Sequence, residues 1–116
     1  MLTNAPALVL LRVPGMSIFT KRLKEMRTAA GLSQERLGIS AGIDPASARA
    51  RVNQYESGKH HPDQLTVRNL ALVLDAPESY FYAVDEDTAR LLLLFHRLPQ
   101  AKRAEVLGLA ETLSKP

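Results

Sequence analysis

Cysteine and tryptophan are both absent from this 116-residue chain, and aromatic residues make up only 5% of it. The absence of cysteine excludes disulfides, zinc–thiolate sites and a cysteine nucleophile. Long apolar runs are also missing, since the charge-free apolar run over residues 7–11 ends at Arg12 and is far shorter than the ~20 residues of a membrane span. Residues 1–6 carry no basic side chain, which a signal peptide would need. We therefore expect a cytoplasmic protein without a membrane segment.

Apolar residues make up 46% of the sequence, which is enough to build the core of one domain. The formal net charge of +3 permits a polyanionic partner, but only if the basic residues are clustered. No nucleophile–base set, phosphate-binding loop or metal cluster is recognisable, so we expect no enzyme activity, no catalytic residue, no metal and no cofactor. The adjacent His60 and His61 lack an obvious third ligand, and we expect them to be loop residues or phosphate contacts.

Apolar residues recur at three- and four-residue steps, which predicts an all-α fold. The expected helices cover residues 18–30, 34–41, 45–57 and 65–74, a short fifth helix opened by Pro77, and two C-terminal helices over residues 88–98 and 100–113. Residues 83–87 have the composition of a linker. Capping residues and glycine stops bound the first three helices: Ser17 and Gly31, Ser33 and Gly42, Asp44 and Gly58.

Residues 1–16 show no sustained periodicity and contain Pro6, Pro14 and Gly15, so they are predicted to form a flexible N-terminal tail. Met16 stands directly before the first helix. Two alternatives therefore stay open: residues 1–16 form a flexible N-terminal arm, or translation begins at Met16.

The connection between the second and third helices is the most informative segment. Gly42 can adopt the positive φ that a sharp turn between helices requires, and Ile43 can pack between the two helices. This arrangement projects the helix over residues 45–57 outward as a separate rod. A rod of that diameter fits the major groove of DNA.

Over residues 18–82 the chain resembles the lambda-repressor-like (XRE) helix-turn-helix family. Three strings carry the resemblance: Gly-Leu-Ser-Gln-Glu at residues 31–35, Tyr-Glu-x-Gly-Lys at residues 55–59 and Leu-Ala-x-x-Leu at residues 70–74. The resemblance implies a five-helix lambda-repressor-like DNA-binding domain over residues 17–83. The remaining residues 84–116 are expected to form a C-terminal extension of two helices. The resemblance also implies a transcriptional regulator of double-stranded DNA, most often a repressor that occludes a promoter.

The resemblance and the helical projection together assign candidate DNA contacts. On the projection, Ala48, Val52 and Tyr55 face the protein, and Arg, Asn and Gln side chains can read base edges in the major groove. Candidate base contacts are Ser47, Arg49, Asn53 and Gln54, and candidate phosphate contacts are Gln34, Arg51 and Lys59. Arg27 and Glu56 resemble the structural ion pair of the family. Lys21, Arg22 and Lys24 are expected on a solvated face, with weak phosphate contact as the alternative.

Two features of the sequence depart from the family pattern. Four additional residues stand between Gly42 and Glu56, which is about one helical turn, so the inward face is preserved. They lengthen either the N-terminal end of the recognition helix or the turn before it. Gly38 replaces the usual small helix former; it costs about 0.5–1 kcal/mol in a helix but allows close helix packing.

The two C-terminal helices are too apolar to be solvated singly, above all in the Leu-Leu-Leu-Leu-Phe run at residues 91–95. They either complete the core of one chain or form a dimer interface, and we expect a homodimer that matches a palindromic operator. The expected interface residues are Leu91, Leu94, Phe95, Leu98, Leu109 and Leu113. The alternative is a protein-interaction module or antitoxin-like regulator that binds a partner protein through these helices.

Overall fold

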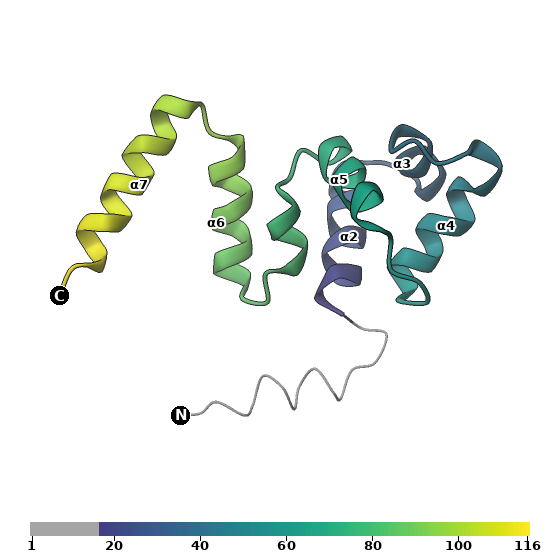
Figure 1. Cartoon of the computed structure of the whole chain (residues 1–116), viewed down its shortest axis with the longest axis horizontal. Coiled ribbons are helices and arrows are strands. Elements are labelled where there is room, and N and C mark those ends of the chain that lie inside the picture. The colour runs from purple at the N-terminus through teal and green to yellow at the C-terminus, as the bar shows by residue number, and fades with distance from the viewer. Residues whose placement is uncertain (1–16) are drawn as a thin grey trace, which may run out of the picture.

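The computed structural model describes residues 17–116, which form helices joined by short turns (Figure 1). The expected tail over residues 1–16 and the alternative start at Met16 lie outside the described residues. No strand occurs in the described part of the chain, and the predicted all-α fold is confirmed. In chain order the helices are α2 (Ile18–Ala29), α3 (Gln34–Ser40), α4 (Pro45–Ser57), α5 (Gln64–Val73), the 3₁₀ helix η1 (Glu78–Tyr82), α6 (Glu86–Arg97) and α7 (Gln100–Ser114).

Capping chemistry explains where the helices begin and end. Glycines beyond the ends of three helices adopt positive φ, which a residue with a Cβ rarely does: Gly31 (72°), Gly42 (92°) and Gly58 (80°). The predicted bounds of the first three helices are therefore correct to within one residue. Five N-cap side chains accept a hydrogen bond from a backbone N–H in the first turn: Ser17, Ser33, Asp44, Asp63 and Asp85.

The short fifth helix opened by Pro77 is present as the 3₁₀ helix η1, in which Tyr80 N donates to Pro77 O at 3.0 Å. One expectation for the second half of the chain is wrong. Helix α6 begins at Glu86, two residues earlier than predicted. Asp85 caps it, since its Oδ2 accepts from both the backbone N–H and the hydroxyl of Thr88, so the linker is shorter than residues 83–87.

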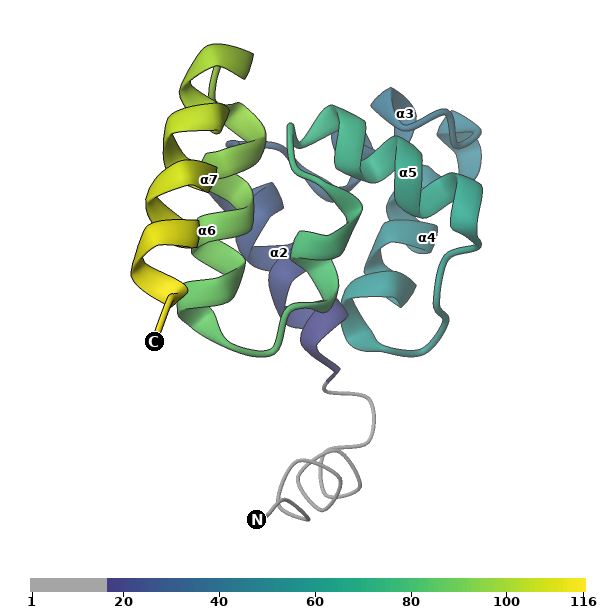
Figure 2. The same cartoon turned by 60° about the vertical axis from the view of Figure 1, so that its left-hand side comes forward.

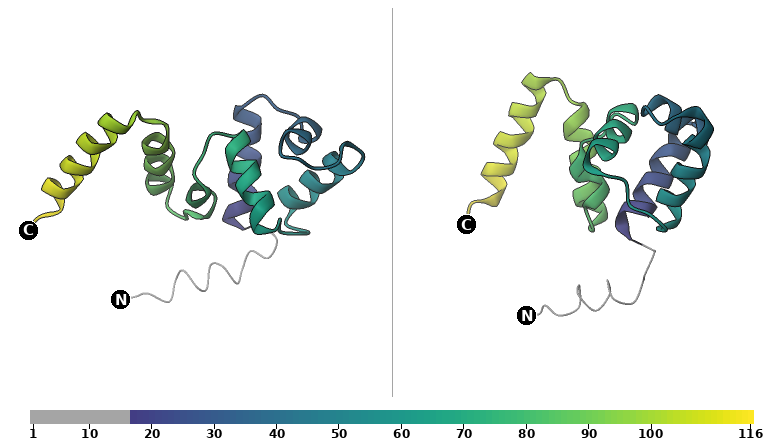
Figure 3. Two further views of the ribbon diagram at one scale, coloured as in Figure 1. Left: turned by 45° about the horizontal axis from the view of Figure 1, so that its top comes forward. Right: turned by 45° about the vertical axis from the view of Figure 1, so that its right-hand side comes forward.

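The core lies between α2, α3, α4, α5 and η1, and α6 adds Ala89 to it. Helix α6 stands beside η1, while α7 lies beyond α6 at the end of the molecule opposite α4 (Figures 1, 2 and 3). None of the helices over residues 17–116 combines the length and apolar character needed to cross a lipid bilayer. The buried apolar side chains are Phe19, Leu23, Met26, Leu37, Ala41, Ala48, Val52, Tyr55, Val67, Leu70, Ala71, Leu74, Ala76, Tyr80, Phe81 and Ala89.

Arg22 corrects the prediction of a solvated face on α2. Its side chain is only 1% exposed, whereas the neighbouring Lys21 and Lys24 are exposed as expected. Arg22 points into the junction between η1 and α6, where backbone carbonyls outside a regular helix need donors. Its Nε donates to Ala83 O at 2.8 Å and its Nη2 to Val84 O at 3.3 Å. The residue is therefore a structural link between α2 and the start of α6.

Candidate nucleic-acid interface

Helices α3 and α4 form a tight unit because a glycine stands where they come closest. A Cβ placed on Gly38 would lie 2.8 Å from Cβ and 3.0 Å from the carbonyl oxygen of Ala48. Real Cβ atoms essentially never approach one another so closely, so only glycine fits at this crossing without a shift. The close packing expected from Gly38 is confirmed.

The turn between α3 and α4 is short and well bonded. Gly42 N donates to Ile39 O at 3.0 Å and Ile43 N donates to Gly38 O at 2.9 Å, which satisfies carbonyls at the end of α3. Ile43 packs, half-buried, against the core. Helix α3 ends at Ser40 and the 13-residue α4 begins at Pro45, so only residues 41–44 connect the two helices.

Helix α4 presents a polar face away from the protein. Its inner positions Ala48 and Val52 are completely buried and Tyr55 is nearly so, as the helical projection predicts. The side chains of Arg49, Arg51 and Asn53 are exposed, and those of Ser47 and Gln54 are half-buried. The outer face of α4 thus carries guanidinium, amide and hydroxyl groups along one side of a rod, and these groups can donate to bases and phosphates.

Gln34, at the first position of α3, lies against this face. Its Nε2 donates to Glu56 Oε1 at 3.0 Å and to Asn53 Oδ1 at 3.3 Å. The amide of Gln34 is therefore held by α4, and its bond to Asn53 occupies the carbonyl oxygen of Asn53, not its amino group. The expected phosphate contact and one expected base contact are brought together by a direct hydrogen bond.

Arg27 and Glu56 form a two-pronged ion pair. Arg27 Nε donates to Glu56 Oε2 at 2.6 Å and Arg27 Nη2 to Glu56 Oε1 at 3.2 Å, while Nη1 donates to Leu32 O at 2.8 Å. The side chains are 15% and 4% exposed, so both charges are largely removed from water. This arrangement ties α2 to the end of α4 and to the loop that leads into α3. It fixes the base of the helix on which the candidate DNA contacts stand.

Basic groups gather at the α3–α4 face. Arg49 and Gln34 line one open hollow of about 410 Å³, together with Arg27, Ser33 and Glu35. Lys59 is exposed directly after Gly58, where the chain leaves α4. The guanidinium of Arg49 and the N-terminus of α3 therefore border the same space.

His60 and His61 do not form a metal site with other described residues, among which no group of three or more His, Asp or Glu side chains could hold a metal ion. His61 Nε2 hydrogen-bonds with the hydroxyl of Tyr82 at 3.1 Å, and its ring packs edge-on against Phe19 with centroids 4.7 Å apart. Partial burial and the nearby Glu78 raise the pKa of Tyr82 above its ordinary value. His61 thus has a packing role.

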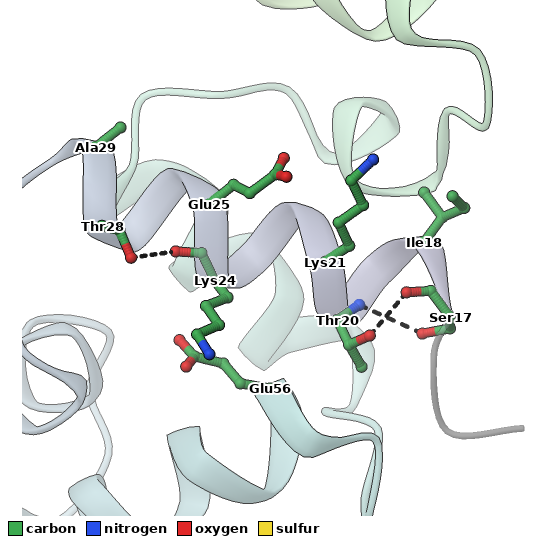
Figure 4. Close-up of a pocket in the computed structure, with 9 residues that line it drawn as sticks. All are labelled: Ser17, Ile18, Thr20, Lys21, Lys24, Glu25, Thr28, Ala29 and Glu56. Atoms are coloured by element: carbon green, nitrogen blue, oxygen red, sulfur yellow. Dashed lines mark hydrogen bonds between the residues drawn. The ribbon is translucent and has the colours of Figure 1, made fainter. Parts of the chain in front are cut away.

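A larger hollow of about 680 Å³ runs along the outer side of α2 (Figure 4). Lys24 and Glu56 lie next to each other at its edge, whereas Lys21 points away from them. Two lysines and two glutamates line it, so it favours no ligand of one charge sign. The lining residues are Ser17, Ile18, Thr20, Lys21, Lys24, Glu25, Thr28, Ala29 and Glu56.

Residues 23–81, from α2 to η1, match the model of the helix-turn-helix family. The chain belongs to this helix-turn-helix family. The match covers α3, α4 and the turn between them, so the family assignment and the geometry of the α3–α4 unit concern the same residues.

Known relatives agree with this assignment. Two uncharacterized HTH-type transcriptional regulators, of Sinorhizobium medicae (strain WSM419) and Rhizobium meliloti (strain 1021), are each 33% identical to this helix-turn-helix protein over 61 residues. The match covers 53% of this chain and 41% of each relative, so the chain spans about two fifths of their length. The crystal structure of the transcriptional regulator BswR is similar with a TM-score of 0.74 and 39% identity, covering 80% of this chain and 92% of that chain.

The C-terminal helices of this helix-turn-helix protein present the apolar side chains expected at a dimer interface. Leu91, Leu94, Leu109 and Leu113 are exposed, and Phe95 and Leu98 are half-buried. Within residues 17–116, α7 buries none of its side chains. A single chain therefore leaves this face uncovered by the described residues.

The turn between α6 and α7 is nevertheless defined. Arg103 reaches back from α7 to the end of α6, where its Nε donates to Phe95 O at 3.0 Å and its Nη2 to His96 O at 2.6 Å. The guanidinium also lies over the ring of Phe95, 5.5 Å from its centroid. These bonds satisfy carbonyls at the C-terminus of α6 and orient the start of α7.

Proposed function

We propose that this protein is a transcriptional regulator that binds double-stranded DNA by inserting α4 into the major groove. The observation that carries the proposal is the α3–α4 unit, in which Gly38 and Ala48 lock the two helices together and the outer face of α4 is polar and basic. A helix presented in this way can reach base edges that are unique to each base pair. Membership of the helix-turn-helix family supports the same function.

Within this proposal the outer residues of α4 read sequence and their neighbours hold the backbone. Arginine can donate two bonds to guanine, and asparagine or glutamine can do so to adenine. The hydrogen bond from Gln34 to Asn53 supports a shared role, in which one amide contacts a phosphate and the other faces a base. The proposed base contacts are Ser47, Arg49, Asn53 and Gln54, and the proposed phosphate contacts are Gln34, Arg51 and Lys59.

We also propose that the protein acts as a homodimer, with the exposed leucines of α6 and α7 covering each other across a two-fold axis. A C2 dimer presents two copies of α4 related by that axis, and an inverted-repeat operator has the same symmetry. Bound at a promoter in the cytoplasm, such a dimer would repress transcription by occlusion. This function requires no enzyme activity, metal or cofactor.

The uncovered face of α7 also favours a second candidate function, in which the C-terminal helices bind a different protein. Exposed apolar patches of this kind mark interaction sites in general and do not by themselves name the occupant. An antitoxin-like regulator would use this face for its partner and the α3–α4 unit for DNA. Measuring the molar mass of the purified protein by light scattering separates the two, because a homodimer forms without any other protein.

Selection from a random library of duplex DNA with the purified protein tests the proposed function. We expect enrichment of an inverted repeat, because two copies of α4 would contact equivalent half-sites. Arg49→Ala should reduce the preference for the selected sequence. Arg90→Ala, an exposed arginine on α6, is the matched control and should leave the preference unchanged. Failure of the unmodified protein to enrich any sequence would contradict the proposal.

A further inference from the structure

Helix α6 is fastened to the body of the protein at its N-terminal end by a buried arginine. Arg22 donates to Ala83 O and Val84 O, its Nη1 lies 3.4 Å from Glu86 Oε1, and its guanidinium lies over the ring of Tyr80. Lys21 Nζ adds an exposed bond of 2.7 Å to Glu86 Oε2. The guanidinium of Arg22 therefore fixes the residues just before α6, and Glu86 at the start of α6, relative to α2.

The C-terminal end of α6 is fastened in the same way to the end of α5. Arg97 Nε donates to Asp75 O at 3.0 Å and Arg97 Nη2 donates to Leu74 O at 3.2 Å. The carboxylate of Asp75 lies 3.4 Å from His96 Nε2 and 3.5 Å from Arg97 Nε. Because Asp75 has a positive φ of 52°, the chain reverses sharply there and turns these carbonyls toward α6.

Apolar packing holds the middle of α6 between the two arginines. Ala89 is buried in the core and Leu93 packs against it. On the other side of the helix Leu91 and Leu94 remain exposed. Helix α6 therefore has one face fixed to the body that carries α4 and another that belongs to the proposed dimer interface. A rotation of α6 relative to that body would break hydrogen bonds at one end or at both.

We propose that Arg22 and Arg97 are positioning residues that set the spacing between operator half-sites. In a dimer joined through α6 and α7, the distance and rotation between the two α4 helices depend on how rigidly α6 is attached to the rest of each chain. Each added base pair moves a half-site by roughly 3.4 Å and rotates it by roughly 35°. A rigid attachment therefore selects one spacing, and a loose one tolerates several. This inference rests on the proposed dimeric DNA-binding function.

The test compares binding to two DNA series. One carries the selected half-site twice, as an inverted repeat whose central spacing changes in single base-pair steps, and the other carries the half-site once. Arg97→Ala is the principal variant, since Arg97 is partly exposed and its loss leaves the core intact. Arg97→Lys retains the charge, Arg22→Met tests the other end of α6, and Arg90→Ala is the control with an exposed arginine on the same helix.

For the unmodified protein we expect affinity at the best spacing to exceed that at neighbouring spacings by about tenfold or more, because only correctly spaced half-sites bind as a linked pair. Arg97→Ala should flatten this profile to about threefold or less while the affinity for the single half-site stays unchanged. Arg97→Lys should lie between the two, and Arg90→Ala should keep the sharp profile. Arg22→Met, if it folds, should also flatten the profile.

Each other outcome overturns the inference. A sharp profile that persists in Arg97→Ala, or a flat profile in the unmodified protein, would show that these arginines do not set the spacing while DNA binding itself stands. Equal loss of affinity for single and paired half-sites in Arg97→Ala would show a merely structural role. An unmodified protein that binds neither series would overturn the proposed function and this inference with it.

Discussion

Gly38 is the residue at which the helix-turn-helix unit is most sensitive to a single methyl group. Because a Cβ there would lie 2.8 Å from Ala48 Cβ and 3.0 Å from its carbonyl oxygen, Gly38→Ala forces the two helices apart. Overpacking costs about 1–3 kcal/mol, which exceeds the roughly 0.5–1 kcal/mol that alanine gains over glycine in a helix. We expect Gly38→Ala to lower the free energy of unfolding, as measured by urea denaturation.

Gly108→Ala is the matched control for this substitution. Gly108 lies inside α7, and no atom of the described chain lies within 4 Å of a Cβ placed there, apart from the helix's own backbone and its neighbours in sequence. The change should stabilise the protein by about 0.5–1 kcal/mol, since only helix propensity acts. If Gly38→Ala were stabilising by the same amount, the close approach of α3 and α4 would not be a real constraint.

The Arg27–Glu56 pair predicts a measurable coupling. Both side chains are largely buried, so removing one partner leaves the other charge without its counterpart, at a cost of about 3–5 kcal/mol. A double-mutant cycle of Arg27→Ala and Glu56→Ala in urea should give a coupling energy of about 1–3 kcal/mol. The exposed pair Arg68–Glu78, at 3.7 Å, is the control and should give about 0.2–1 kcal/mol. Equal coupling energies in the two cycles would contradict a buried ion pair between Arg27 and Glu56.

The burial of Arg22 follows from its position in the sequence. Arg22 stands three residues after Phe19 and four before Met26, on the same stripe of α2 as the buried apolar residues, and that spacing was sufficient to predict an inward side chain. Its acceptors could not be predicted, because Ala83 and Val84 lie 61 and 62 residues further along the chain. The same holds for Arg97 and the carbonyls at the end of α5.

Among the elements, the end of α4 offers a test that separates affinity from sequence preference. Lys59 follows Gly58 as an exposed cation, and a phosphate contact adds affinity for every DNA sequence alike. Lys59→Ala should weaken selected and unselected DNA equally and reduce the slope of log K against log salt by about one unit. Lys102→Ala on α7 is the control and should leave the slope unchanged. A changed sequence preference without loss of affinity would exclude this role.

Asn53→Ala, within α4, should instead reduce the preference for the selected sequence. Loss of a base contact costs about 1–3 kcal/mol on the preferred sequence and little elsewhere. Because Asn53 accepts a hydrogen bond from Gln34, part of this loss would come from a less ordered Gln34. Binding of the variant to the selected site and to single-base variants of it, at fixed salt concentration, measures both components. An equal loss on all sequences would place Asn53 among the phosphate contacts.

Most elements were predictable because local chemistry determines them. Ser17, Ser33 and Asp44 cap their helices, and Gly42 makes the turn, as the sequence indicated. The start of α6 was misplaced because residues 83–87 have the composition of a linker. The hydrogen bonds from Thr88 to Asp85 place the start at Glu86. Whether the additional residues lie in α4 or in its turn likewise depends on tertiary packing, since Ala48 must meet Gly38.

Two truncations distinguish the roles of the C-terminal helices. Removing residues 100–116 deletes α7, which has no buried side chain within the described chain, so we expect a folded monomer. Removing residues 86–116 also deletes Ala89 from the core and Glu86 from Arg22, and should lower the free energy of unfolding. Light scattering measures whether each truncated protein is a monomer, and urea denaturation measures its free energy of unfolding. A dimer that persists without residues 100–116 would place the interface on α6 alone.

For the molecule as a whole, acid pH should weaken the fold. Hydrogen bonds from Thr88 hold the pKa of Asp85 below its ordinary value, and those from Lys21 and Thr66 do the same for the pKa of Glu86 and Asp63. The unfolded chain therefore binds more protons than the folded protein in the acid range. The stabilisation is complete above the ordinary values near pH 4 and is lost as pH falls through the lowered values.

Urea midpoints measured from about pH 3 to pH 7 test this dependence. Asp85→Asn is the informative variant, because asparagine remains a good N-cap but cannot ionise. Its midpoint should fall less steeply toward acid than that of the unmodified protein. Parallel curves for the two proteins would show that the charge of Asp85 does not contribute.

The lack of buried side chains in α7 has a consequence for how the protein behaves in dilute solution. A free helix of 15 residues is marginal in water, and α7 also carries a glycine near its middle and has no side-chain N-cap. Its backbone amides should therefore lose their protection against hydrogen exchange well before those of α2 or α5. Because any molecule that covers α7 would slow this exchange, the rate at a given protein concentration reports directly on what occupies the C-terminal face. The helix content of α7 thus becomes a measure of how much of the protein is bound to a partner or to a second copy of the chain.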